Sequence, residues 1–85
     1  MSTITRTIAS DWYSGVERQY RVTVEVALDW HTQEIDSFDD VTAVELVHAN
    51  GWPNPELPLE ILDRAFVESL RRAVQEQECP GVLFA

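Results

Sequence analysis

The sequence predicts an α+β fold in which a three-stranded antiparallel sheet packs one face against a single C-terminal helix. Two patterns carry this prediction. Apolar and polar side chains alternate along residues 20–30, and apolar side chains recur every three or four positions along residues 58–77. Alternation is typical of a strand with one buried face, and the longer spacing is typical of an amphipathic helix. The expected order is β-β-β-α, followed by a short apolar tail.

The first strand is expected over residues 2–9, because threonine occupies alternate positions there and its branched side chain favours extended backbone. Ile4 and Ile8 share the opposite parity with Arg6. A charged side chain on an apolar parity favours an edge strand, where its head can reach water. Residues 10–17 contain turn formers and are expected to close a hairpin.

The segment at residues 20–30 is the one around which the rest of the chain is expected to be organised. Its apolar parity comprises Tyr20, Val22, Val24, Val26, Leu28 and Trp30. These side chains define one face of a long strand, and only the C-terminal helix is long enough to cover that face. Trp30 is therefore expected in the core.

Residues 32–40 are polar and acidic, with Ile35 and Phe38 as isolated apolar anchors, so a loop is expected there. The third strand is expected over residues 41–49. Apolar side chains occur on both parities of this segment, which is typical of a strand that is buried on both faces or central in its sheet. An Asn-Gly pair directly afterwards predicts a turn.

The helix is expected over residues 58–77, after a stiff and extended proline-rich segment at residues 52–58. Its apolar stripe consists of Leu59, Leu62, Phe66, Leu70, Ala73 and Val74, widened by Ile61 and Ala65. A Pro-Gly pair ends the helix. The apolar residues 82–85 are expected to dock as a short strand or against the core.

The length of 85 residues suits a single domain over residues 1–85, with no room for a second core. No apolar run approaches the roughly 20 residues that span a bilayer, and residues 1–10 lack the layout of a signal peptide. The single cysteine, Cys79, cannot form an internal disulfide. These features favour a cytoplasmic protein.

Charge is the most informative part of the composition. The sequence contains fifteen acidic residues, six arginines and no lysine, for a formal net charge of -9. No arginine or lysine lies between residues 22 and 63. Such a surface repels nucleic-acid phosphates and anionic lipid headgroups, and it attracts basic protein surfaces. Direct binding to nucleic acid or to a membrane is therefore not expected. The alternative is that the acids only keep a small protein soluble.

The sequence indicates no catalytic or metal-binding motif. Cys79 falls at the expected C-terminal end of the helix, where the helix dipole disfavours a thiolate. The spacing of His31, His48 and Cys79 matches no zinc motif, and the acids near residue 40 lack the frame of a calcium loop. We therefore expect a protein that is not an enzyme and that binds no metal or cofactor.

The candidate partner-binding residues are acids of the long strand and the following loop, together with two tryptophans. They are Glu25, Asp29, Glu34, Asp36, Asp39, Asp40, Trp12 and Trp52. Tryptophan at the rim of a surface is a typical anchor for partner proteins. The alternative for the two tryptophans is that they close the ends of a small core.

In size, acidity and β-rich layout with one helix, the whole chain resembles small phage-encoded inhibitors of host defence, such as anti-CRISPR proteins. Those proteins share no common motif, so the resemblance assigns no functional residue. It implies a non-catalytic inhibitor whose acidic surface docks on a basic, nucleic-acid-handling partner, in an anti-defence or DNA-mimic role. The alternative is a homo-oligomeric structural or assembly protein, such as a homodimer or a virion accessory protein.

Overall fold

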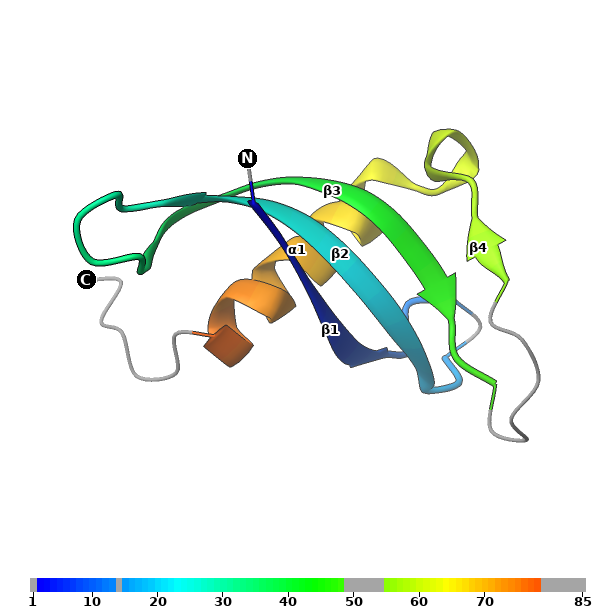
Figure 1. Ribbon diagram of the computed structural model, residues 1–85. Helices are drawn as coiled ribbons and strands as arrows, with labels where there is room; N and C mark the ends of the chain where they lie inside the picture. The colour runs from blue at the N-terminus through cyan, green and yellow to red at the C-terminus, as the bar shows by residue number, and fades with distance from the viewer. Residues whose placement is uncertain (1, 14, 49–54, 79–85) are drawn as a thin grey trace.

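The computed structural model describes residues 2–13, 15–48 and 55–78, which form an α+β fold with one curled antiparallel sheet and one C-terminal helix (Figure 1). The elements are β1 (Ser2–Ser10), β2 (Arg18–Leu28), β3 (Ile35–Leu46), β4 (Glu56–Leu57), the 3₁₀ helix η1 (Leu59–Ile61) and α1 (Arg64–Glu78). The predicted class is confirmed. Within these residues, however, the sheet has four strands in the order β1-β2-β3-β4, one more than predicted.

The core lies between α1 and the apolar face of β2. Tyr20, Val22, Val24 and Val26 are at most 3% exposed, so alternate residues of β2 point inward as predicted. The helix contributes the buried side chains Phe66, Leu70 and Val74. Figure 1 shows α1 crossing one face of the curled sheet. β1 adds Ile8 to the same core, and as an edge strand it pairs only with β2 among the described residues.

The far end of β2 departs from the prediction. The strand ends at Leu28, and Trp30 lies in the following turn with 79% of its surface exposed. Placing Trp30 in the core was therefore wrong. The reason is that β1 begins at Ser2 opposite Val26, so β2 continues past this end of β1 and the hairpin projects beyond it.

β3 begins at Ile35, so the prediction of a loop over residues 32–40 was wrong for most of that segment. Four apolar residues of β3 lie opposite residues of the apolar parity of β2. The pairs are Ile35 with Leu28, Phe38 with Val26, Val41 with Val24, and Val44 with Val22. Each step of three residues on β3 therefore matches a step of two on β2. Three successive register shifts, each a β-bulge with one extra residue, produce this pairing.

The helix begins later than predicted. Asp63 caps α1, because its carboxylate accepts a hydrogen bond from Ala65 N at 2.8 Å. The chain before it forms β4 and η1 instead, after an extended segment at Pro55 whose carbonyl accepts from Leu46 N at 3.1 Å. Ile61 is 74% exposed and Ala65 is also exposed, so neither widens the buried stripe.

Some predictions fall outside the described residues. These concern residues 49–54, which include the Asn-Gly turn and Trp52, and residues 79–85, which include Cys79 and the apolar tail. In the part of the chain that the structure describes, no helix has the length and apolar character needed to span a bilayer.

Candidate docking surface

The structure brings the predicted acidic residues together on one hairpin. We name residues 25–40, which run from β2 through the turn into β3, the acidic arm. It contains Glu25, Asp29, Glu34, Asp36, Asp39 and Asp40 and no arginine or lysine. Its formal charge is therefore -6 out of a total of -9, leaving -3 for the other 69 residues of the 85.

The bulges of β3 explain why so many acids share this hairpin. A regular strand places one outward residue between two inward residues, whereas a bulged step places two. Asp39 and Asp40 occupy the step between Phe38 and Val41, and both are exposed. Glu25 lies on the neighbouring strand opposite the same step. Asp36 is the extra residue of the step nearest the turn. The bulges thus raise the number of carboxylates that point away from the core.

Arginine side chains neutralise acids elsewhere on the molecule. Arg6 pairs with Glu78, and Arg21 lies 3.9 Å from Glu45 in the N–O distance. Glu68 pairs with Arg71 and also lies 3.7 Å from Arg72. Within residues 2–13, 15–48 and 55–78, no arginine forms an ion pair with an acid of the arm.

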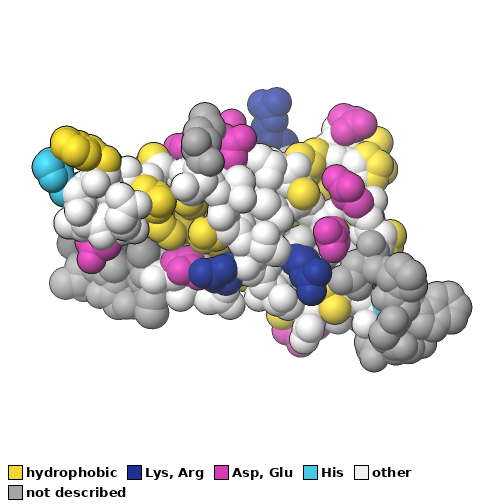
Figure 2. Space-filling model, viewed as in Figure 1, with side chains coloured by type: hydrophobic (Ala, Val, Ile, Leu, Met, Phe, Trp, Pro, Cys, Tyr) yellow, Lys and Arg dark blue, Asp and Glu magenta, His cyan; other side chains and the backbone are white. Residues whose placement is uncertain are grey.

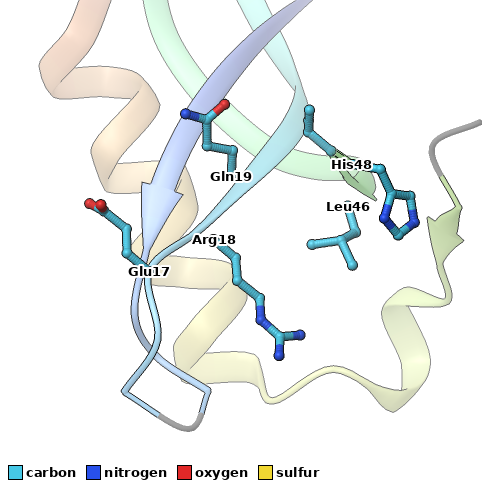
Figure 3. Close-up of a pocket in the computed structure, with 6 residues that line it drawn as sticks. Glu17, Arg18, Gln19, Leu46 and His48 are labelled. Atoms are coloured by element: carbon cyan, nitrogen blue, oxygen red, sulfur yellow. The ribbon is translucent and has the colours of Figure 1, made fainter. Parts of the chain in front are cut away.

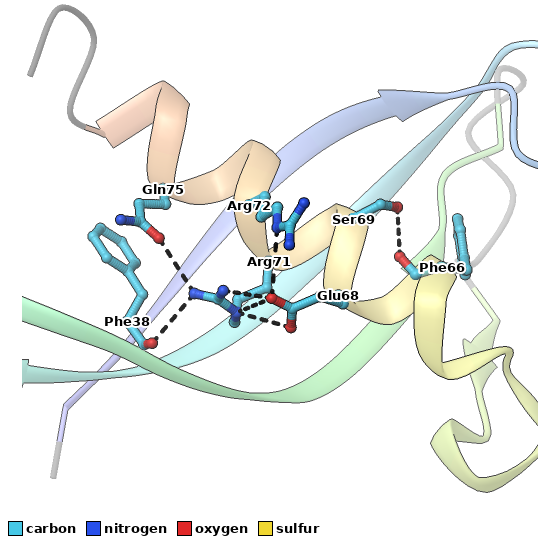
Figure 4. A network of polar contacts seen from close by, with 7 residues as sticks. All are labelled: Phe38, Phe66, Glu68, Ser69, Arg71, Arg72 and Gln75. Carbon is cyan, nitrogen blue, oxygen red and sulfur yellow. Dashed lines mark hydrogen bonds and ion pairs between the residues drawn. The ribbon is translucent and has the colours of Figure 1, made fainter. Parts of the chain in front are cut away.

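Arg71 touches the acidic arm. Its Nη1 lies 3.5 Å from the carbonyl oxygen of Phe38, and it also donates to Glu68 and Gln75 (Figure 4). The hydrogen bond with Glu68, more than the charge of Asp40, raises the pKa of Arg71. The same hydrogen bond lowers the pKa of Glu68. Arg71 thus contacts the backbone of the arm from α1, while its ion pair is with Glu68.

The predicted tryptophans do not join the acids. Trp12 lies in the β1–β2 connection, at the opposite end of β2 from the arm, and is 47% exposed. Its ring centroid is 6.1 Å from that of Phe66, and the ring centroid of Tyr13 is 4.9 Å from Phe66. Trp12 therefore covers one end of the core. Trp52 lies outside the described residues.

Sequence reasoning missed Trp30 as a surface residue. Its ring centroid is 4.1 Å from that of His31, and both side chains lie in the turn between β2 and β3. In Figure 2, the end of the molecule that holds this turn carries an apolar side chain beside a histidine. One signal was present in the sequence, because Asp29 can initiate a turn by accepting hydrogen bonds from the next backbone amides.

No protein-family model, curated protein or solved structure matches this chain. The function must therefore be inferred from the geometry of the molecule. The acidic arm combines concentrated negative charge with an exposed aromatic side chain at its tip. An exposed tryptophan is typical of the residues that anchor protein interfaces, and concentrated charge steers the encounter with a partner of opposite charge.

A second feature, a hollow at the other end of β2 and β3, offers less chemistry. Glu17, Arg18, Gln19, Leu46, Val47 and His48 line it. Figure 3 shows Glu17 pointing to the side opposite Arg18 and His48, so these groups do not converge. Across the described residues, no three histidine, aspartate, glutamate or cysteine side chains are placed to share a metal ion.

Proposed function

We propose that this protein is a non-catalytic inhibitor that docks its acidic arm on a basic, nucleic-acid-handling protein. The observation that carries the proposal is the concentration of six acids on one hairpin, none of which forms an ion pair with an arginine of the described residues. A row of carboxylates can occupy a protein surface that otherwise holds phosphates, and the complementary charges steer the encounter. An anti-defence role, as in the phage-encoded inhibitors that the chain resembles, is one form of this function.

The distribution of charge favours docking over solubility alone. A charge of -6 lies on the 16 residues of the arm, whereas the rest of the chain has nine acids and six arginines, for a charge of -3. Solubility requires net charge but no such concentration, and gathered like charges repel one another. Among the described residues β4 pairs only with Val44 and Glu45 of β3, so the bulged part of β3 is an open sheet edge, and acids there also oppose pairing with other strands.

The test compares two variants with equal loss of charge. The first neutralises the arm through Asp36→Asn, Asp39→Asn and Asp40→Asn. The control neutralises three exposed acids outside the arm through Glu56→Gln, Glu60→Gln and Glu76→Gln. Each immobilised protein captures partners from a cell lysate, and the captured proteins are then challenged with salt and with double-stranded DNA.

We expect the wild type and the control to retain a nucleic-acid-binding protein that salt and DNA both release, because electrostatic contacts are screened by ions and shared with phosphates. The arm variant should lose that protein. Equal capture by both variants, or capture that resists salt and DNA, would contradict the proposal.

Assembly into homo-oligomers is the second candidate, and the nine-residue edge strand β1 is the observation that favours it. Arg6 Nη1 donates to Thr5 O at 2.8 Å and Gln77 Nε2 donates to Thr7 O at 3.4 Å, so two edge carbonyls already have donors. This arrangement opposes pairing between edges. A mass of 9.7 kDa by light scattering supports the inhibitor, and twice that mass supports assembly.

A further inference from the structure

We propose that Trp30 is the anchor of the acidic arm, and that it inserts into an apolar pocket of a partner protein whose rim carries arginine or lysine. The inference rests on the docking function proposed above and names the residue at the centre of the contact. Trp30 is 79% exposed, the largest exposed fraction among the large apolar side chains that the structure describes. Single exposed apolar residues are common on proteins, so its surroundings must distinguish it.

The turn that carries Trp30 is ordered by its own hydrogen bonds. Gln33 N donates to Asp29 O at 2.7 Å, and Gln33 Nε2 donates to Trp30 O at 3.2 Å. The Asp29 carboxylate accepts from His31 N at 2.8 Å and from Thr32 N at 3.2 Å. Gln33 adopts a left-handed φ of 61° to complete the turn. Because the turn is ordered before binding, little conformational entropy is lost when a partner protein binds the indole ring.

The indole ring is supported on one side and open on the other. The rings of Trp30 and His31 are tilted by 34°, so the imidazole contacts the indole while most of the indole surface stays in water. Leu28, at the end of β2, is also 38% exposed. The tip therefore presents a supported aromatic ring with an aliphatic neighbour. Tryptophan in such a position is the residue type most enriched among the residues that dominate binding energy at interfaces.

The charge around Trp30 indicates the chemistry of the partner. Asp29, Glu34 and Asp36 lie within six residues of Trp30 in the chain, on either side of it in the β2–β3 hairpin. A pocket that accepts the ring therefore has to place basic side chains beside these carboxylates. A second copy of this chain does not meet that requirement, because two arms of charge -6 would repel each other. An anionic membrane would be repelled for the same reason.

The first experiment identifies what Trp30 touches. Trp30 is replaced by the photo-reactive residue p-benzoylphenylalanine, and a matched protein carries the same residue in place of Trp12. After illumination in cells that produce each protein, the adducts are mapped by mass spectrometry. We expect position 30 to give one main protein adduct, with the cross-link beside arginine or lysine and next to apolar residues. Adducts to a second copy or to lipid, no adduct, or the same adduct from position 12 would overturn the proposal.

The second experiment measures how tightly each variant binds the partner protein that the cross-link identified. We expect Trp30→Ala to weaken binding at least about 30-fold, which is typical of an anchor residue, and Trp30→Phe to retain more affinity than alanine. Trp12→Ala should change binding less than about 3-fold. The thermal midpoint of Trp30→Ala should stay within about 2 °C of wild type, since the residue is exposed. Unchanged affinity in Trp30→Ala would contradict the anchor.

The two proposals fail in different ways. If the three-acid arm variant loses the partner protein while Trp30→Ala keeps it, the docking function stands and the anchor is wrong. If Trp30→Ala loses the partner protein while the arm variant binds it normally at every salt concentration, the anchor stands and electrostatic docking is wrong. If both variants bind normally, both proposals are wrong.

Discussion

Phe66 is the side chain that ties the helix to the sheet. It is fully buried, and its ring centroid lies 4.9 Å from that of Tyr13 and 5.2 Å from that of Tyr20. We predict that Phe66→Ala lowers the free energy of unfolding by about 4 kcal/mol, because it removes a large buried side chain and leaves a cavity. Urea unfolding followed by circular dichroism measures the change.

The matched control for Phe66 is Ile61, another large apolar residue of the predicted stripe. Ile61 is 74% exposed, so Ile61→Ala should change the free energy of unfolding by less than about 0.5 kcal/mol. Similar losses in the two variants would contradict the difference in burial between Phe66 and Ile61.

Glu68 gives a prediction about pH. Its hydrogen bond with Arg71 holds its pKa below the ordinary value of 4.5. A carboxyl whose pKa is lower in the folded state stabilises that state above its unfolded pKa, and this stabilisation is lost as the pH falls through the folded pKa. Glu68→Gln should therefore destabilise the protein at pH 7, and the difference from wild type should shrink below about pH 4.5.

Thermal unfolding of wild type and Glu68→Gln across pH 3 to 7 measures this difference. Glu76→Gln is the control, because it removes an exposed acid of the same helix that forms no ion pair with the described arginines. A constant difference between wild type and Glu68→Gln over the whole pH range would contradict the assignment.

At the scale of single elements, β2 was predictable, and so was β3 from Val41 to Leu46, whereas the first half of β3 was not. Strict alternation places Val22 and Val24 on the same face, because a strand has a period of two, and the middle of an apolar face has to be covered. The apolar residues of β3 recur every three positions, from Ile35 to Val44, which matches no regular strand. A bulge in each three-residue interval of β3 explains this spacing. Bulges depend on the neighbouring strand, so a single sequence does not reveal them.

The bulges predict an asymmetry between deletions. Deleting Asp36 leaves one outward residue, Ser37, between Ile35 and Phe38, which is the spacing of a regular strand opposite β2. This variant should keep its fold and lose at most about 1 kcal/mol. Deleting Thr23 from regular β2 instead turns part of the valine row outward, and the chain should not fold.

Circular dichroism and urea unfolding compare the two deletions. The deletion of Asp36 should give a cooperative transition, whereas the deletion of Thr23 should give none. If deletion of Asp36 is as damaging as deletion of Thr23, the extra residues of β3 are not accommodated as bulges.

For the whole molecule, the sequence predicted the class and the covering of the sheet by the helix, and the acids that it named as partner-binding lie on one hairpin. It did not predict where those acids lie relative to the tryptophans. Trp12 was expected with the acids and lies at the other end of β2, whereas Trp30 was expected in the core and lies at the tip of the arm. The alternation of side chains assigns Trp30 to one face of the strand. It does not show where the elements that cover this face end.

The overall shape follows from the same hairpin. The molecule measures 41 × 27 × 25 Å, and the β2–β3 hairpin projects past the end of β1 along the sheet (Figure 1). A projecting hairpin with -6 of the net charge can reach into a concave partner surface that the body of the protein could not enter. The helix face, in contrast, is used to close the core.

Hydrogen exchange on the complex with the captured partner is the most direct test of docking through the acidic arm. Exchange of backbone amides is compared, by mass spectrometry, between the free protein and the complex. We predict that new protection falls on residues 25–40, with the largest change in the turn around Trp30. Protection confined to β1 or α1, with the arm unchanged, would contradict the central claim.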